Sequence, residues 1–450
     1  MSENNKNNDA PREQALSIAA GAVEDDDSPQ TDVVAGDQPT EKPKRLWLLI
    51  AVVVVCVAVI AVAIVVPVSV TMQNKAGKSE ATDPLVPTVP TVAPVTAAPV
   101  TAAPTYSSQG LAALVRSRLL SISFDNTTSP ESRALNWMAK VDTSDQGTLS
   151  DDQLVQRFAM AAIGMSINGL ENWFTDSSEC SWGSGRVACN SLGEVILIDA
   201  RSDSLSGSIP VSIGLLTNIE TVDLGYNALT GTIPTEMGRV SALIGLDLLY
   251  NTLSGKIPSE VGGLTALTSL NLGLNRLTGT IPSELGGLTA MSVLILFTNQ
   301  LSGTIPSELG GLTALTSLSL AHNRLTGSIP TEVGELTALR DLSLRINALT
   351  GTIPSEVGGL TALIGLSIDS NTLTGTIPSE VGGLTALELL YLNNTQLTGT
   401  MPMDVCGWLY PPFIDCGEIV CDCCQDSAGV QCPSEERHKP DLRKFSATQL

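Results

Sequence analysis

The sequence predicts an α/β solenoid of nine 24-residue coils, and three observations support this prediction. An asparagine recurs every 24 residues from Asn227 to Asn371 without a slip, and Asp203 and Thr395 occupy the same position at the two ends. Apolar residues precede this position by eight, five and three residues in every coil. Only 4% of the residues are aromatic, which suits a regular repeat better than one large globular core.

Each coil is expected to begin with a short strand, because residues two apart, such as Leu246 and Leu248, point to the same side of an extended chain. Strands of successive coils would pair in a parallel sheet about 4.8 Å apart. The asparagine turns the chain out of the strand, and its amide can bond backbone groups of neighbouring coils. Gly255 then relaxes the backbone, and Ile257-Pro258 fixes an extended return on the convex side.

The chain before the repeats contains a polar segment and then an apolar run. Residues 1–45 hold ten acidic and five basic side chains without an apolar period, so we expect a disordered segment. Leu46–Val70 is uncharged over 25 residues and would extend about 37 Å as a helix, more than the roughly 30 Å hydrocarbon layer, which predicts one transmembrane helix. A cleaved signal peptide is the alternative, but 45 residues precede the run, which is also long for that role.

Charges and cysteines indicate which side of the membrane each part occupies. Lys42, Lys44 and Arg45 before the helix outnumber Lys75 and Lys78 after it, which favours a cytoplasmic N-terminus. Eight of the nine cysteines follow the helix, as expected for disulfides in an oxidising compartment. They are Cys180, Cys189, Cys406, Cys416, Cys421, Cys423, Cys424 and Cys432. We therefore expect a single-pass type II protein of the plasma membrane, with its C-terminal side extracellular.

Two further patterns agree with an extracellular C-terminal side. Asn126 and Asn393 each begin an N-glycosylation sequon. Residues 71–108 are rich in Pro and Thr, which predicts an extended stalk with hydroxyls for O-glycosylation.

Residues 109–194 are expected to form a small helical region in front of the solenoid. Ser129-Pro130 places a cap before a proline at the first helical position, and Ser150 with Gln153 forms a capping box. Between these helices, Asp142–Gly147 resembles the start of an EF-hand loop, but Gln153 stands where calcium coordination needs a glutamate. We interpret the segment as a plain interhelical turn and expect no metal site or cofactor.

The repeat itself identifies a family resemblance. Leu267-x-x-Leu270-x-Leu272-x-x-Asn275-x-Leu277-Thr278-Gly279-x-Ile281-Pro282 resembles the plant-type leucine-rich repeat, and the resemblance covers residues 195–402. It implies a leucine-rich-repeat superhelix with a helical N-terminal cap and a cysteine-rich C-terminal cap, in addition to the one transmembrane helix. It also implies a receptor-like protein, without a kinase domain because no kinase motif occurs.

The caps are expected to be stapled by disulfides. The segment from Cys180 to Cys189 resembles the paired-cysteine N-terminal cap of the family, which implies that these two cysteines pair. Residues 403–432 resemble a C-terminal cap with six cysteines, for which 15 connectivities remain open. A zinc site there is the alternative, and residues 433–450 would form a tail.

Comparison of the coils with one another predicts where a ligand binds. The convex return recurs almost verbatim, whereas the outward positions of the strand differ from coil to coil. We expect Leu249, Tyr250, Ile295 and Phe297 to form an exposed apolar patch on the concave face, because exposed aromatic and Arg residues often anchor interfaces. Drift among solvent-facing positions is the alternative. The candidate binding residues are Asp247, Leu249, Tyr250, Ile295, Phe297, Arg340, Arg345, Asp369 and Tyr391.

Two periodic columns outside the strands have simpler interpretations. Seven glutamates, from Glu236 to Glu380, recur on the convex side, where each would favour the N-terminus of a short helical turn after a Ser or Thr cap. Stacked Thr-Gly-Thr units such as Thr278-Gly279-Thr280 resemble the threonine arrays of ice-binding proteins, although Lys256 interrupts the column.

Composition and motifs narrow the function class. A formal charge of -22 without a basic stripe argues against general nucleic-acid binding. The two histidines, His322 and His438, belong to no recognisable catalytic constellation, so we expect no enzyme. We expect a recognition protein whose concave face binds a peptide, glycan or protein partner, with a cytosolic adaptor on residues 1–45. A structural or adhesion protein without a specific ligand is the alternative, and ice binding is a more remote one.

Overall fold

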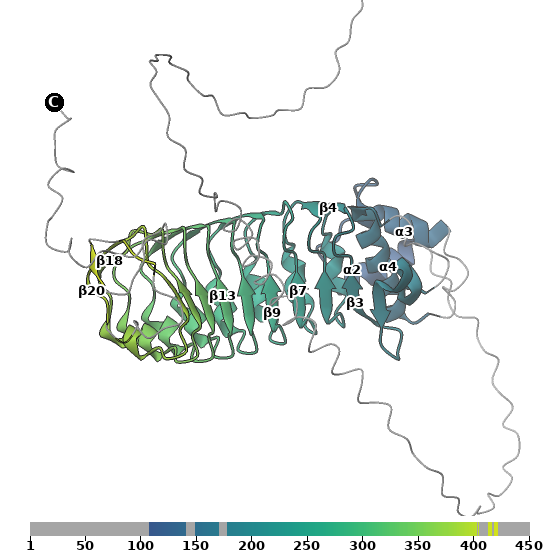
Figure 1. Ribbon diagram of the computed structural model, residues 1–450. Coiled ribbons are helices and arrows are strands. Elements are labelled where there is room, and N and C mark those ends of the chain that lie inside the picture. Colours follow the sequence, from purple (N-terminus) through teal and green to yellow (C-terminus); the bar gives the residue numbers. More distant parts are fainter. Residues whose placement is uncertain are drawn as a thin grey trace, which may run out of the picture. The chain divides into compact units, whose positions relative to one another are not determined.

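The computed structural model describes residues 108–140, 149–170, 178–402, 404, 413–415 and 418–421. Figure 1 shows these residues as three helices followed by a stack of coils. Among the described residues, no helix is both long enough and apolar enough to cross a membrane. The predicted segments 1–45, 46–70 and 433–450 lie outside the described residues. So do the EF-hand-like loop Asp142–Gly147 and all of the predicted stalk except its last residue.

The three helices are α2 (Ser108–Arg118), α3 (Pro130–Lys140) and α4 (Asp151–Ser166). Both predicted helix starts are confirmed. The Ser129 hydroxyl accepts a hydrogen bond from the Ser132 N–H at 3.1 Å, and Ser150 and Gln153 form the reciprocal capping box of α4. Helix α4 is buried along most of its length and packs against the first coil, so it covers the apolar end of the solenoid.

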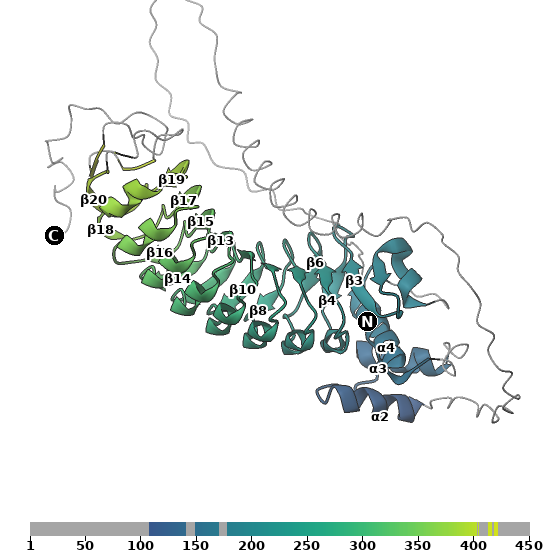
Figure 2. The same cartoon turned by 90° about the horizontal axis from the view of Figure 1, so that it is seen from below.

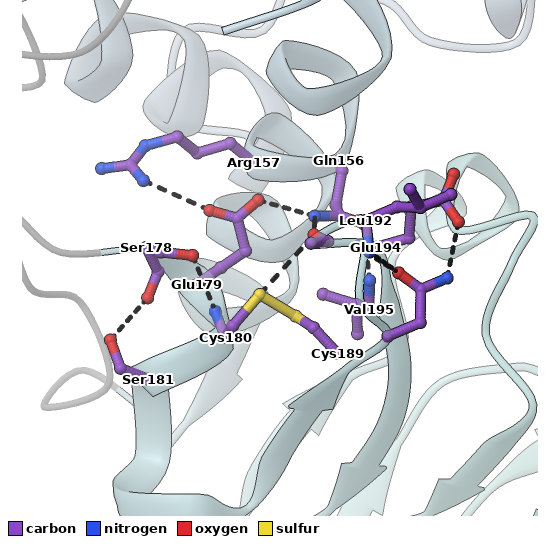
Figure 3. Close-up of a disulfide and its surroundings, with 12 residues drawn as sticks. Gln156, Arg157, Ser178, Glu179, Cys180, Ser181, Cys189, Leu192, Glu194 and Val195 are labelled. Carbon is purple, nitrogen blue, oxygen red and sulfur yellow. Dashed lines mark hydrogen bonds and ion pairs between the residues drawn. A yellow bond between two sulfur atoms is a disulfide. The ribbon is translucent and has the colours of Figure 1, made fainter. Parts of the chain in front are cut away.

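The N-terminal cap joins α4 to the first coil through a disulfide and a buried ion pair (Figure 3). The pairing of Cys180 with Cys189, implied by the family resemblance, is confirmed; Cys180 lies in η3 (Glu179–Gly185). Arg157 of α4 meets Glu179 at 3.2 Å, with both side chains almost fully buried, and the Arg157 guanidinium lies 5.8 Å from the Trp137 and Trp182 rings. A buried charge pair of this kind needs both members, because either one alone would be an uncompensated charge.

A ten-stranded sheet runs the length of the solenoid. Its first strand is antiparallel to the second, and the others are parallel with a constant 24-residue register, so that Leu294 lies between Leu270 and Leu318. The strands are β2 (Val187–Cys189), β3 (Val195–Asp199), β5 (Thr221–Asp223), β7 (Gly245–Asp247), β9 (Ser269–Asn271), β11 (Val293–Ile295), β13 (Ser317–Ser319), β15 (Asp341–Ser343), β17 (Gly365–Ser367) and β19 (Leu389–Tyr391). Figure 2 shows this sheet on the inner side of the arc.

A second set of strands, which we call the lateral strands, follows the asparagine of each coil. Strands β8 to β16 form one five-stranded parallel sheet, and shorter sheets continue it at both ends. The lateral strands are β4 (Ser206–Ser208), β6 (Ala228–Thr230), β8 (Ser254–Gly255), β10 (Arg276–Gly279), β12 (Gln300–Gly303), β14 (Arg324–Gly327), β16 (Ala348–Leu349), β18 (Thr374–Thr376) and β20 (Gln396–Thr400).

Short 3-10 turns complete the coils on the convex side. Each begins after a proline in extended conformation, with no side-chain cap, so the predicted Ser or Thr cap is wrong: that residue is already the first of the turn. In the first coil, Ser212 occupies the position that is glutamate in the later coils. It is fully buried, because α4 packs against this coil. The turns are η4 (Val211–Leu215), η5 (Thr235–Arg239), η6 (Ser259–Gly263), η7 (Ser283–Gly287), η8 (Ser307–Gly311), η9 (Thr331–Glu335), η10 (Ser355–Gly359) and η11 (Ser379–Gly383).

The recurring asparagines form a ladder of hydrogen bonds between coils. The Asn275 amide donates to the carbonyls of Leu248, Leu272 and Gly273 at 2.9, 3.2 and 3.1 Å, while its oxygen accepts from the Leu253 N–H at 3.0 Å. Equivalent bonds recur from Asn227 to Asn371. Each asparagine therefore satisfies backbone groups of its own coil and of the coil before it.

The residue before each asparagine has a left-handed backbone. Its φ angle lies between 52° and 56° from Tyr226 to Asn394, although none of these residues is glycine. The conformation aims two successive N–H groups at the next coil: Tyr226 donates to the Leu249 carbonyl and Asn227 to the Tyr250 carbonyl. These bonds offset a backbone cost of about 1–2 kcal/mol per residue. The positions are Tyr226, Tyr250, Leu274, Thr298, His322, Ile346, Ser370 and Asn394.

Additional strands cover the sheet ends. At the N-terminal end, β2 covers the ten-stranded sheet, and β1 (Ile167–Asn168) pairs antiparallel with β4. At the C-terminal end, β21 (Ile419–Val420) pairs with β20, and Phe413 forms a bridge with Tyr391. These short strands cover part of the sheet edges that another chain could otherwise pair with. Cys421 is disulfide-bonded, whereas Cys406, Cys416, Cys423, Cys424 and Cys432 lie outside the described residues.

Asn275→Ala is expected to lower the free energy of unfolding by about 3 kcal/mol, because it leaves several buried backbone groups without partners. Urea unfolding followed by circular dichroism would measure the change. Gln300→Ala, on an outward position of a lateral strand, is the control and should change the value by less than about 0.5 kcal/mol. Equal effects of the two substitutions would contradict the structural role of the ladder.

Candidate ligand-binding face

The concave face consists of the side chains that point away from the core on the ten-stranded sheet and on the bend that follows each strand. They occupy the positions four, two and one residues before the recurring asparagine. At these positions Asp, Gly, Leu, Phe, Ser, Arg and Tyr alternate from coil to coil, whereas the inward positions are almost all Leu, Ile or Val. The face is therefore chemically diverse on a uniform support.

The apolar residues of this face come together, but they do not form the exposed patch that the sequence predicts. Leu249 and Ile295 are buried, at 8% and 3% exposed, and only Tyr250 is well exposed, at 55%. For Leu249 the cause is Gly273, which lies between the coils of Leu249 and Phe297. A Cβ on Gly273 would lie 2.8 Å from the Phe297 ring and 3.0 Å from Leu249, so both side chains lean into the space above the glycine.

An arginine and two aspartates form a charged cluster at the N-terminal end of the face. The Arg201 guanidinium reaches across two coils to Asp223 at 3.2 Å and Asp247 at 2.7 Å. It also lies 4.6 Å from the ring of Tyr226, which stacks on Tyr250 with a centroid distance of 5.4 Å. These contacts fix the orientation of the tyrosine pair at the rim of the face.

Burial and charge set the protonation of this cluster. Burial raises the pKa of Asp223, and the neighbouring Asp247 raises it further, while the Gly225 N–H and Arg201 oppose the shift. Contacts with both aspartates raise the pKa of Arg201 against the opposing effect of burial. Arg201 therefore stays charged and holds together two carboxylates that would otherwise repel each other.

A second charged cluster lies in the C-terminal half of the face. The Arg345 Nε is 3.7 Å from Asp369, which is only 5% exposed. One oxygen of Asp369 is buried without a hydrogen-bond partner, and burial raises the pKa of this carboxyl. Burial lowers the pKa of His322, and the positive charge of Arg345 lowers it further. The Arg345 side chain is 47% exposed, so it can also contact a ligand.

The remaining predicted residues lie near the edges of the face. Arg340 is exposed at the start of β15, beside Asp341. Tyr391 is partly buried because it stacks on Phe413 with a centroid distance of 4.9 Å. The structure thus brings Arg345 and Asp369 together, and Asp247 and Tyr250 each contact members of the Arg201 cluster.

The two sequons differ in accessibility. Asn126 is exposed, and its side-chain oxygen accepts hydrogen bonds from the Thr128 N–H and hydroxyl. Asn393 is 9% exposed, so its amide lacks the room that an attached glycan needs. The prediction of a glycan at Asn393 therefore conflicts with the fold, whereas the prediction for Asn126 is compatible with it.

Sequence reasoning did not predict the contacts of Arg201 and Tyr226 or the space that Gly273 leaves for its neighbours. A signal for them existed: glycine replaces a larger side chain at the position two before the asparagine only at Gly225 and Gly273. A Cβ on Gly225 would lie 3.0 to 3.2 Å from Arg201, Asp247 and Asp223. Both glycines thus make room for side chains that cross from neighbouring coils.

Comparison with known proteins agrees with this architecture. A family model described as leucine rich repeat matches residues 265–325. No curated protein matches the chain. The ectodomain of the Arabidopsis thaliana membrane receptor kinase GASSHO1/SCHENGEN3, solved in complex with CASPARIAN STRIP INTEGRITY FACTOR 2, is 37% identical with a TM-score of 0.53. That match covers 56% of this chain and 30% of the receptor chain.

Two other solved structures are similar to this chain with lower TM-scores. The plant peptide hormone receptor RGFR1, in complex with RGF2, is 30% identical over 51% of this chain and 46% of its own, with a TM-score of 0.42. A plant ice-binding protein is 26% identical over 54% of this chain and 87% of its own, with a TM-score of 0.45. The chain spans about a third to a half of the two receptor chains, and its repeat region resembles plant leucine-rich-repeat receptor ectodomains.

Asp369→Asn is expected to stabilise the protein at pH 7, by roughly 1 kcal/mol, because it removes a buried charge whose oxygen lacks a partner. The pKa of Asp369 is raised in the folded state, so its destabilising contribution develops as pH rises above the unfolded value of 3.8 and is complete above the folded pKa. The gain should therefore shrink as pH falls toward 4. Thermal unfolding from pH 4 to pH 8 tests this, with the exposed Glu388→Gln as control; a gain independent of pH would contradict it.

Proposed function

We propose that this protein is a receptor-like recognition protein whose concave face binds a peptide or protein partner. The proposal rests on the observation that amino-acid differences between the coils are concentrated on one surface. Side chains differ from coil to coil at the outward positions of the concave face, while the core leucines, the asparagine ladder and the 3-10 turns repeat with little change. A uniform scaffold that carries one diverse surface is typical of repeat proteins that bind through that surface.

The chemistry of the face suits such a partner. Tyr250, Phe297 and Arg345 offer partly exposed aromatic and guanidinium groups, which are the side chains that most often anchor interfaces. The similar GASSHO1/SCHENGEN3 ectodomain was solved with a bound factor, which supports a ligand-binding role here. We propose that the protein binds its partner and does not catalyse a reaction on it.

We further propose that Leu46–Val70 anchors the chain in the plasma membrane with the repeats outside, and that residues 1–45 meet a cytosolic adaptor. These proposals rest on the uncharged run and on the charge bias around it. The confirmed disulfide agrees with an oxidising compartment for the repeats.

The double substitution Phe297→Asp and Arg345→Glu is expected to abolish capture of the partner, because it places a charge on the apolar part of the face and reverses the exposed guanidinium. The full-length chain would be used to capture ligands from cell-surface extracts, followed by mass spectrometry. Thr337→Glu, exposed on the convex side after η9, is the matched control and should retain capture.

The opposite outcome would favour the adhesion alternative. If every molecule captured by the wild-type chain is also captured by the double variant, the concave face is not the binding site. A protein with a structural role in the cell surface would in addition resist extraction by detergent, which a simple membrane receptor would not.

A further inference from the structure

The lateral strands carry positive charge in a strongly acidic chain. The chain has a formal charge of -22, yet none of the described lateral strands contains Asp or Glu. Arg276 lies at the start of β10, Arg324 at the start of β14, and Lys256 directly follows β8; all three side chains are exposed. These strands belong to the five-stranded sheet, in which β8 pairs with β10, and β12 lies between β10 and β14 (Figure 2).

These three cations differ from most others in the described part of the chain. Arg157, Arg201 and Arg345 each meet a carboxylate. Lys256, Arg276 and Arg324 form no ion pair with a carboxylate of the described residues. Their charge is therefore available to a partner.

The positions of the three cations form a group on neighbouring parts of the sheet. Arg276 is paired with Ser254, two residues before Lys256, so Lys256 and Arg276 are diagonal neighbours on adjacent strands. The stem of Lys256 lies above Gly279 of the next coil, where a Cβ would come within 2.9 Å of its Cγ. Arg324 lies two strands beyond Arg276, about 10 Å across the sheet for a spacing of 4.8 Å per strand, and it is also shifted along the strands because it pairs with Ser302.

Ordered hydroxyls surround the cations. The hydroxyls of Thr278 and Thr326 donate to carbonyls of the preceding coil at 3.2 and 3.3 Å, which leaves their oxygens as acceptors. Thr280 and Thr304 place a methyl group above the glycine of the next coil, 2.9 and 2.8 Å from where a Cβ would stand. This packing restricts the side-chain rotamer, so the exposed hydroxyls form a regular array.

The edge of this surface limits where an anion can lie. A groove of about 790 Å³ runs beside the sheet, with Lys256, Thr280 and Thr304 among its lining residues. The same groove contains Glu260, Glu284 and Glu308, which would repel an anionic group. The sheet itself carries only positive formal charge, so an anion would lie on the strands and not in the groove.

We propose that the five-stranded lateral sheet binds a linear anionic polysaccharide, through Lys256, Arg276 and Arg324. Guanidinium and ammonium groups pair with sulfate or carboxylate, and the hydroxyl array exchanges hydrogen bonds with sugar hydroxyls. A polymer suits a group of separate cations because each additional contact is made at high effective concentration. This surface is distinct from the concave face, so either proposal can fail while the other holds.

The triple substitution Lys256→Gln, Arg276→Gln and Arg324→Gln tests the charges. Binding of the full-length chain to dextran sulfate, polygalacturonate and neutral dextran would be measured by biolayer interferometry at low and high salt. We expect one or both anionic polymers to bind at low salt, and the triple variant to bind at least about tenfold more weakly. The preferred polymer distinguishes sulfate from carboxylate recognition.

A matched control keeps the same change in net charge. Thr289→Glu, Thr313→Glu and Thr337→Glu also lower the charge by three, at exposed equivalent positions on the convex side, and should change affinity less than about threefold because exposed charges beyond a Debye length are screened. Thermal unfolding would verify that both variants fold. Absence of binding to both anionic polymers, equal binding of neutral dextran, or equal losses in the two triple variants would overturn the proposal.

A final comparison tests the sugar-specific part. Thr280→Val with Thr304→Val keeps the methyl groups above the glycines and removes the two hydroxyls. We expect this variant to bind the anionic polysaccharide several-fold more weakly while its weak binding to polyglutamate is unchanged. If polyglutamate binds the wild-type chain as tightly as the polysaccharides do, the surface is a general polyanion site and the proposal is wrong.

Discussion

The hydrogen bonds of the recurring asparagine are the constraint on which the rest of this structure depends. One side-chain amide satisfies three carbonyls and one N–H in two coils, and no apolar residue can replace it in a buried position. The residue before the asparagine has a left-handed conformation, which residues other than glycine adopt only at a cost. The ladder therefore determines where each coil bends and the orientation of the side chain just before each asparagine.

This constraint separates the surfaces of the solenoid. The asparagines and the inward apolar residues are nearly the same in every coil, because each must pack and bond with the equivalent residues of the coils before and after it. The concave positions do not have to match their neighbours in this way. Arg201 lies there, with a guanidinium that spans two coils. Gly273 also lies there, and its missing side chain leaves space for Phe297 and Leu249. The lateral strands are still partly constrained to match adjacent coils, because a methyl group of one coil fills the space above a glycine of the next. Diversity is therefore greatest on the concave face.

The sequence was sufficient to predict whatever is local or strictly periodic. The register, the inward leucines, the capping box at Ser150 and Gln153 and the turn glycines follow from spacing, and the family resemblance implied the pair Cys180–Cys189; the structure confirms them. Contacts between side chains of different coils were not predictable in this way. Leu249 and Ile295 are buried by neighbours one or two coils away, and the Arg157–Glu179 pair joins elements that no repeat relates. The charged clusters around Arg201 and Asp369 depend on the reach of single side chains, which spacing alone does not give.

The covered ends of the two sheets have a consequence for how such a molecule can change in size. The strand pairs and asparagine bonds of each coil reach only the adjacent coils. The helices meet the first coil, and the β21 segment meets the last one. Deletion or duplication of one complete 24-residue unit in the middle of the solenoid would leave the strand pairs and asparagine bonds at each remaining junction in place. Length can therefore vary in whole units during evolution or design without new end pieces, and each added unit would extend both the concave and the lateral surface by one strand.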